Sequence, residues 1–391
     1  MNRDTATAHA GQIMLDYAGS TGLEPVRAHP KRYLWTDAFA VCTCLGLFQR
    51  THDESWRNLA LRLVSQVHHT LGRHRDDDPR TGWISGLPEE EGRLHPTHGG
   101  LRIGKQTHER GIHEFYNERF EWDRDGQYFH YLTKWMHALN RVSRVTGDPK
   151  YTGWAMELAH TAHARFTYLP PEGGRRRMYW KMSIDLTRPL VPAMGQHDPL
   201  DGLVTFSELQ LTASKDFPQL ARLDLSHEIA GLADMCRGMS WATDDPLGTG
   251  GLLADASRIA QLAMTGGRGY EELLEEVVGS ALECVTSFAR GNSLALPAEY
   301  RLAFRELGLS IGLKGVGQLP GWIRDNPELS GRKSSLEAQV EALLVHVPLG
   351  ETIERFWMDS KNQQAGTWTG HREINMVMLA TSLAPEGFLM V

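Results

Sequence analysis

The hexapeptide Thr146-Gly147-Asp148-Pro149-Lys150-Tyr151 joins two runs of helical periodicity, 126–146 and 148–168. The glycine suits the end of the first helix, the aspartate offers an N-cap acceptor to the second, and the proline fits the second helix's first turn. The aromatic ring three residues after the aspartate can pack back on the preceding helix. The hexapeptide therefore predicts a helical hairpin.

Similar short connectors recur along the chain. They are Thr51-His52-Asp53-Glu54-Ser55-Trp56, Ser214-Lys215-Asp216-Phe217-Pro218 and Thr265-Gly266-Gly267-Arg268-Gly269-Tyr270. Each ends one apolar-periodic run and opens the next, which indicates an irregular repeat of helical hairpins. The alternative is coincidence, since every helical hairpin needs a capped turn.

Helical periodicity covers most of the sequence. We expect about twelve helices, at 8–18, 36–50, 53–74, 126–146, 148–168, 203–214, 217–239, 249–264, 269–290, 298–313, 335–346 and 371–384. Residues 176–184 alternate and predict a small β-hairpin within a loop. The linkers 75–125 and 169–202 are long, and loops of that length in compact proteins usually carry function.

Alternate helix starts gather acids, histidines and aromatic rings. These starts are Trp35-Thr36-Asp37-Ala38-Phe39, Asp123-Arg124-Asp125-Gly126-Gln127-Tyr128, Gln196-His197-Asp198-Pro199-Leu200-Asp201-Gly202, Thr243-Asp244-Asp245-Pro246-Leu247-Gly248, Leu296-Pro297-Ala298-Glu299-Tyr300 and Gly370-His371-Arg372-Glu373-Ile374-Asn375. The remaining helices open with ordinary capping turns. One set of helix ends is therefore expected to carry chemistry.

This pattern resembles the six-hairpin glycosidase superfamily, whose fold is an (α/α)6 toroid. Residues 35–39 resemble the tryptophan-rich start of the first inner helix in unsaturated glucuronyl hydrolases, and residues 146–151 resemble a hairpin turn of N-acylglucosamine 2-epimerase relatives. The resemblance implies an all-α protein in which residues 1–391 form a single toroidal domain. It also implies that inner helices line a cavity and that a sugar binds where the long loops converge.

The composition of the chain limits the classes of binding partner that we expect. Lys and Arg number 41 against 48 Asp and Glu, a net charge of −7, which argues against nucleic acid or an anionic membrane as the main partner. We found neither a secretory signal nor an apolar run of membrane-spanning length. Cys42, Cys44, Cys236 and Cys284 fit buried free thiols in a reducing compartment. A cytoplasmic location is expected, and the oligomeric state stays open.

Glycosidic hydrolysis needs two carboxyl groups, one protonated and one ionised. The densest supply is the acid- and aromatic-rich segment 114–125, in which Asp125 is the candidate catalytic acid. The alternative is a solvated charged loop with Asp125 capping a helix. A second group joins His197 to Asp198 and Asp201, and the alternative there is an Asx-turn around Pro199.

The third group is His371 with Glu373, at the start of the last predicted inner helix, where pairing with a neighbour is the alternative role of Glu373. Side chains at the same helix ends and loops are expected to bind the sugar. They are Trp35, Asp37, Tyr116, Glu118, Glu121, Trp122, Tyr128, Trp180, Trp241, Asp244 and Trp368. His95 and His98, in a loop rich in glycine and proline, could bind a metal, but no second pair stands at zinc-finger spacing. Histidines at 108, 113, 160 and 163 show no metal-site pattern either, so we expect no metal and no cofactor.

These features favour a glycoside hydrolase that acts on an oligosaccharide through paired carboxylates. The first alternative is an N-acyl-sugar or aldose 2-epimerase or isomerase. Its acid and base would be His197 and His371, with His130 as a further candidate. The second alternative is a sugar-binding toroid without catalysis.

Overall fold

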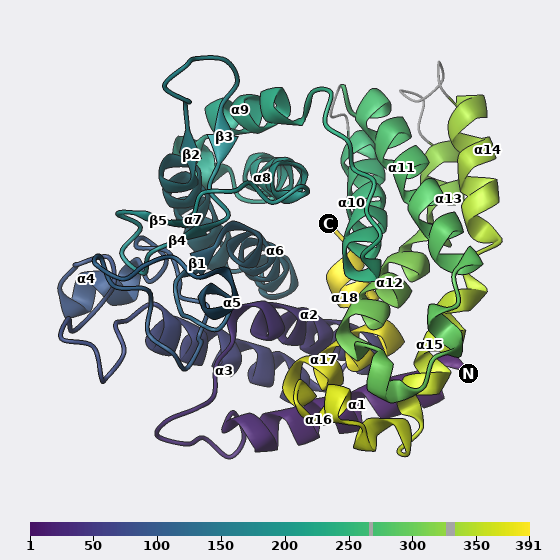
Figure 1. Cartoon of the computed structure of the whole chain (residues 1–391), viewed down its shortest axis with the longest axis horizontal. Helices are drawn as coiled ribbons and strands as arrows, with labels where there is room; N and C mark the ends of the chain where they lie inside the picture. The colour runs from purple at the N-terminus through teal and green to yellow at the C-terminus, as the bar shows by residue number, and fades with distance from the viewer. Residues whose placement is uncertain (266–268, 326–332) are drawn as a thin grey trace. The chain divides into compact units, whose positions relative to one another are not determined.

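The computed structural model describes residues 1–265, 269–325 and 333–391, and its secondary structure is overwhelmingly helical (Figure 1). This confirms the all-α prediction. The chain divides into two compact units. The middle unit comprises Ala18–Leu45 and Asp53–Met239, and the terminal unit comprises Met1–Tyr17, Gly46–His52 and Ser240–Val391. A single toroidal domain over 1–391 stays a prediction.

The middle unit is built on long helices: α3 (Glu54–Leu71), α6 (Phe129–Thr146), α7 (Lys150–Phe166), α8 (Asp198–Lys215) and α9 (Ser226–Cys236). Helix α6 packs against α3, α7 and α8, and α8 packs against α9. Short helices α4 (Glu89–Leu94) and α5 (Glu118–Glu121) interrupt the linker 75–125. Helices α1 (Arg3–Thr21) and α2 (Leu34–Thr51) each contribute residues to both units.

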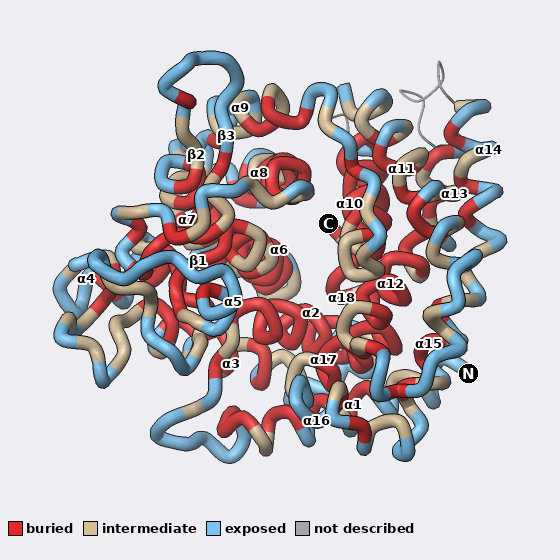
Figure 2. Tube along the Cα trace, in the orientation of Figure 1, coloured by how far each residue is buried: buried red, intermediate tan, exposed pale blue. Residues whose placement is uncertain are grey.

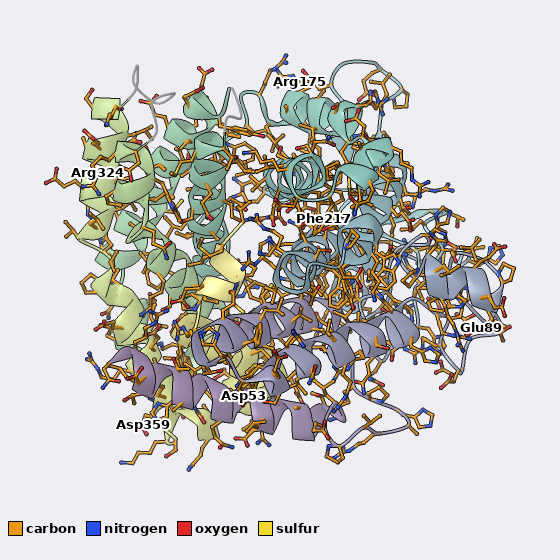
Figure 3. The ribbon with its side chains drawn as sticks, turned by 180° about the vertical axis from the view of Figure 1, so that it is seen from behind. Asp53, Glu89, Arg175, Phe217, Arg324 and Asp359 are labelled. Atoms are coloured by element: carbon orange, nitrogen blue, oxygen red, sulfur yellow. The ribbon has the colours of Figure 1, made fainter. Side chains whose placement is uncertain are left out.

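The turns at Asp53 and Gly147 carry caps that their sequences predict, although the N-cap residue of α7 is Pro149, without a side-chain cap bond, rather than Asp148. Gly147 ends α6 in the left-handed region, with φ of 76°, where a side chain would be strained. Asp148 accepts the Lys150 N–H at 3.1 Å at the start of α7. Asp53 caps α3 by accepting the Ser55 N–H at 2.9 Å. Figure 3 labels Asp53 at the start of this helix.

Two of the expected connectors, at 214–218 and 265–270, do not show the predicted capped turn between two helices in the described residues. The helix predicted at 217–239 is wrong at its start, because residues Pro218–Leu223 form a 3₁₀ helix and α9 begins only at Ser226. Of the connector Thr265–Tyr270, residues 266–268 lie outside the described residues.

Small antiparallel strands occur in the middle unit, as expected, but they do not form one hairpin. Strands β1 (Gln127–Tyr128), β4 (Lys181–Met182) and β5 (Pro189–Val191) pair in the order β1-β4-β5. Strands β2 (Thr167–Tyr168) and β3 (Arg177–Met178) form a separate pair. The predicted 176–184 hairpin is therefore divided between two sheets. Its first half, β3, pairs with β2 across the exposed loop that contains Arg175, which Figure 3 labels.

The terminal unit contains α10 (Pro246–Met264), α11 (Tyr270–Arg290), α12 (Ala303–Val316), α13 (Leu319–Arg324), α14 (Lys333–Leu344), α15 (Pro348–Met358), α16 (Gly366–Thr369), α17 (Arg372–Leu383) and α18 (Glu386–Leu389). Helices α10 and α12 are buried along most of their length (Figure 2). Helix α15 was not predicted, because Pro348 and Gly350 weaken its signal. Proline fits its first turn, and Ile353 and Trp357 are buried.

The four cysteines are buried and are not joined in disulfides. Burial, with a smaller contribution from neighbouring Cys42, raises the pKa of the Cys44 thiol to about 12. Within the described ranges, we found no helix both long and apolar enough to cross a membrane.

Helices α10 and α12 touch backbone to backbone through glycine. A Cβ atom on Gly250 would overlap the backbone of Gly308, and one on Gly312 would lie 2.5 Å from the Gly250 carbonyl oxygen. Adjacent Gly251 has no atom within 4 Å of such a Cβ. The close approach therefore depends on Gly250, Gly308 and Gly312.

Replacing Gly250 by alanine tests this contact. We expect Gly250→Ala to destabilise the terminal unit by about 1–3 kcal/mol, because overpacking forces the helices apart. Gly251→Ala is the matched control, and it should stabilise by up to about 1 kcal/mol through helix propensity. Urea denaturation measures both, and equal effects of the two substitutions would contradict glycine-dependent packing.

His68 of α3 lies in the core of the middle unit beside two tryptophans. The Trp135 Nε1–H of α6 donates to His68 Nε2 at 3.1 Å, and the Trp154 ring meets it edge-on at 5.1 Å. A nitrogen that accepts this hydrogen bond carries no proton. Burial lowers the pKa of His68 from 6.5 to about 3.

This shift makes the middle unit sensitive to acid. Between pH 6.5 and about pH 3, His68 is protonated in the unfolded chain but remains neutral in the folded chain. Stability is therefore expected to fall as the pH decreases through this range, by on the order of 1 kcal/mol per pH unit. Denaturation midpoints in that window should depend less on pH in His68→Gln. The exposed neighbour provides the control His69→Gln, which should keep the wild-type slope.

Candidate functional site

Six rings of the middle unit meet around the start of α6. This aromatic cluster consists of Tyr33, Trp122, Tyr128, His130, Tyr131 and Trp180. The pairing of β1 with β4 sets Tyr128 opposite Lys181, which brings the adjacent Trp180 within 6.3 Å of the Tyr128 ring. Trp122 meets Trp180 edge-on at 4.8 Å. Three predicted sugar-binding residues, Trp122, Tyr128 and Trp180, are thus neighbours.

His130 and Asp198 form the titratable pair of this region. His130 lies in the first turn of α6 and Asp198 begins α8, and their Nδ1 and Oδ1 atoms are 3.5 Å apart. The histidine side chain is 28% exposed, whereas the aspartate side chain is 7% exposed. The second carboxylate oxygen, Asp198 Oδ2, is buried without a hydrogen-bond partner. Gly195 leaves room for this carboxylate, since a Cβ there would lie 2.6 Å from it.

Asp201 lies in the same first turn of α8 but has strong partners. Its carboxylate accepts the Thr133 hydroxyl at 2.6 Å and the Lys134 ammonium at 2.5 Å. Both donors come from α6, so Asp201 ties these two helices together. His197 precedes Asp198 as the N-cap residue of α8 and is partly exposed.

Asp125 is fully buried and holds a loop in place. Its Oδ2 accepts Arg102 Nη1 at 2.8 Å, while Oδ1 accepts the backbone N–H groups of Gly104 and Lys105 at 3.0 and 3.3 Å. The Gly126 N–H adds a further donor at 3.1 Å. These contacts account for the carboxylate structurally, and its catalytic role stays a prediction.

Glu121 is also buried and paired with cations. Its carboxylate accepts Arg110 Nε at 2.9 Å and lies 3.2 Å from Lys181 Nζ. The lysine also donates to the carbonyl oxygens of Glu121 and Arg124. Burial lowers the pKa of Lys181, although the Glu121 carboxylate acts in the opposite direction. This network anchors the segment that precedes β1.

The remaining predicted site residues of the middle unit differ in burial: two are buried and two are exposed. Trp35 and Asp37 are buried in α2, where the Trp35 ring lies 4.4 Å from Phe39 and the Asp37 carboxylate accepts the Tyr33 N–H at 2.9 Å. Tyr116 and Glu118 are exposed. The Arg110 guanidinium lies 5.7 Å from the Tyr116 ring.

Five predicted residues belong to the terminal unit. Trp241 and Trp368 are buried, and Trp368 stacks on Trp357 at 5.7 Å. Asp244 and His371 are exposed, and the His371 ring lies 5.6 Å from Phe304. Glu373 is partly exposed. Helix α10 is capped by Asp245, the neighbour of Asp244.

Sequence reasoning missed Tyr33, Tyr131 and Lys105. The hydroxyls of Tyr33 and Tyr131 are 2.7 Å apart, and burial raises the pKa of both phenols. Lys105 Nζ lies 5.5 Å from the Tyr33 ring centroid, and burial lowers the pKa of this lysine. Tyr131 sits one residue after His130, but Lys105 lies in an irregular loop that gave no signal.

No three His, Cys, Asp or Glu side chains among the described residues gather closely enough to hold a metal ion. Several chemical groups are available at the aromatic cluster. These are an imidazole beside a carboxylate, a lysine ammonium and ring faces.

A stability measurement separates the two roles of Asp125. Asp125→Ala should cost about 3–5 kcal/mol, because it leaves the buried Arg102 guanidinium without its counter-charge. Asp123→Ala, at an exposed aspartate two residues earlier, should change stability by no more than about 0.5 kcal/mol. Thermal and urea denaturation measure both. An Asp125→Ala protein of wild-type stability would contradict the structural role.

The chain matches no family model and no curated protein. Solved structures similar to it include the cellobiose 2-epimerase from Spirochaeta thermophila, at 13% identity over 89% of this chain and 86% of the other, with a TM-score of 0.46. A sugar epimerase from a ruminal bacterium is 10% identical over 79% and 75%, with a TM-score of 0.43. An unsaturated glucuronyl hydrolase specific for heparin is 12% identical over 74% and 85%, with a TM-score of 0.34. Sugar epimerases and an unsaturated glucuronyl hydrolase thus occur among these structures.

Proposed function

We propose that the protein is an enzyme acting on a sugar, and that it moves a proton at the carbon next to the sugar carbonyl. Epimerisation and aldose–ketose isomerisation both begin with this step. The observation that carries the proposal is the contact between His130 Nδ1 and Asp198 Oδ1, 3.5 Å apart within the aromatic cluster.

A carboxylate beside Nδ1 favours the histidine tautomer that carries its proton on that nitrogen. When Nδ1 carries the proton and faces Asp198, the lone pair of His130 lies on Nε2. That nitrogen can then accept a proton from a bound sugar, and the imidazolium that forms is stabilised by the adjacent carboxylate. At 3.5 Å the two atoms form no hydrogen bond in the structure, and His130 Nδ1 is buried without a hydrogen-bond partner among the described residues. Acid–base contacts of this kind often tighten only when substrate binds.

The surrounding rings suit a sugar. The Trp180 ring centroid lies 6.4 Å from the His130 ring centroid. The Trp122 ring centroid lies 4.8 Å from that of Trp180. Trp122 is 44% exposed, and tryptophan rings offer an apolar surface on which the apolar side of a sugar ring can pack. Binding and proton transfer would therefore occur on neighbouring side chains.

Hydrolysis by paired carboxylates is the second candidate. The observation in its favour is the buried Asp198 Oδ2, which has no hydrogen-bond partner. Against it, three other predicted acids of the middle unit, Glu121, Asp125 and Asp201, are bound by Arg or Lys side chains. A hydrolase needs two carboxyl groups free to change protonation or form a bond, so we favour proton transfer.

Hydrogen–deuterium exchange at C2 tests the proposal. Reducing mono- and disaccharides incubated with the protein in D2O should lose their C2–H signal in proton NMR. Since general base catalysis contributes about 10²–10⁴-fold, His130→Gln should slow exchange by about 100-fold or more. Asp198→Asn should also slow it, because the amide no longer holds the imidazole tautomer.

The matched control is His160→Gln. His160 is another partly exposed histidine of the middle unit with its Nδ1 beside a carboxylate, 3.1 Å from Glu228 Oε1. Its replacement should leave exchange unchanged. Release of new reducing ends without C2 exchange would support the hydrolase instead. Binding without either reaction would favour the non-catalytic alternative.

A further inference from the structure

Lys105 is a cation without a salt-bridge partner at the edge of the aromatic cluster. Its ammonium lies 5.5 Å from the Tyr33 ring centroid, and Tyr33 is hydrogen-bonded to Tyr131, the residue after His130. Among the described residues, no carboxylate comes within salt-bridge distance of Lys105 Nζ. Charges removed from water are normally paired, because desolvation is costly. A partly desolvated ammonium without a counter-charge therefore requires a functional explanation.

Two carboxylates act on the Lys105 ammonium through space, but neither forms an ion pair with it. Asp123 and Asp125 favour its charged form through space, yet burial outweighs them and lowers the pKa of the lysine. The Asp125 carboxylate is committed to Arg102 and to backbone N–H groups. Asp123 is exposed. The partly desolvated ammonium is therefore left to interact with something outside the chain.

The loop that carries Lys105 is held rigidly on both sides. Asp125 accepts the backbone N–H of Lys105, and the Arg75 guanidinium donates to its carbonyl oxygen at 2.7 Å. Arg75 is itself fixed by two hydrogen bonds to Asp77, at 2.8 and 2.9 Å. Such support is typical of side chains that must meet a ligand in one position.

We propose that Lys105 binds an anionic substituent of the sugar, either a carboxylate or a phosphate, and thereby sets the substrate class. This inference rests on the proposed function. Two rings, those of Tyr33 and Tyr131, lie between Lys105 and His130 in a series of contacts. The anionic group therefore lies away from the reacting carbon, and Lys105 anchors the substrate rather than transferring its proton.

Binding of three probes tests the inference directly. Glucose, glucuronate and glucose 6-phosphate share a ring and differ in charge, and calorimetric titration at constant ionic strength gives their affinities. Glucuronate, glucose 6-phosphate or both should bind about tenfold or more tightly than glucose, the size expected for one charge-assisted hydrogen bond. Which anion binds better identifies the substituent.

Variants assign the preference to this side chain. Lys105→Met should abolish the difference between charged and neutral probes, and Lys105→Arg should retain most of it. Lys150→Met is the matched control, because Lys150 also lies over a tyrosine ring, at 4.7 Å, but is paired with Asp148. Its replacement should leave the preference intact.

The outcomes separate this inference from the proposed function. Equal affinity for all three probes, or a preference that survives in Lys105→Met, would overturn the role of Lys105 whatever the reaction. An anion preference that depends on Lys105, without C2 exchange, would support the binding inference while refuting the proposed proton transfer.

Discussion

The ion pair between Asp125 and Arg102 is the contact on which the candidate site depends. One buried carboxylate accepts a guanidinium and three backbone N–H groups, which fixes residues 102–105 against the start of β1. Strand β1 in turn leads directly into α6 and places Tyr128 and His130. A buried pair of this kind stabilises little by itself, but losing one partner leaves an uncompensated charge. Its contribution is therefore mainly to geometry.

The same logic explains why an acid-rich sequence supplies few free acids. Glu121 neutralises Arg110 and Lys181, and Asp201 neutralises Lys134. The pairs with Lys181 and Lys134 join residues 60 and 67 apart in sequence. The carboxylates that marked the segment as catalytic thus serve largely to assemble it. Asp198 differs from them because one of its oxygens is buried without a donor.

The helical fold could be predicted from the sequence because helical periodicity and capping are local, as the turns at Asp53 and Gly147 demonstrate. Trp122 and Tyr128 were anticipated as neighbours from their positions near one helix start, whereas Trp180, in the predicted β-hairpin, was expected to bind the sugar but was not placed beside them. The partner of each carboxylate was not anticipated, because ion pairs such as Arg102 with Asp125 join residues 23 apart. Lys105 gave no signal at all, since an unpaired charge is recognisable only once its surroundings are known.

The buried cysteines have a practical consequence. A thiol reacts as its thiolate, so a Cys44 side chain whose pKa is about 12 is protected from alkylation and oxidation while the fold is intact. Cys42, Cys44 and Cys236 belong to the middle unit and Cys284 to the terminal unit. The rate at which each thiol becomes modified therefore reports the opening of its own unit. The chain carries native probes with which the local stability of its two parts can be followed separately.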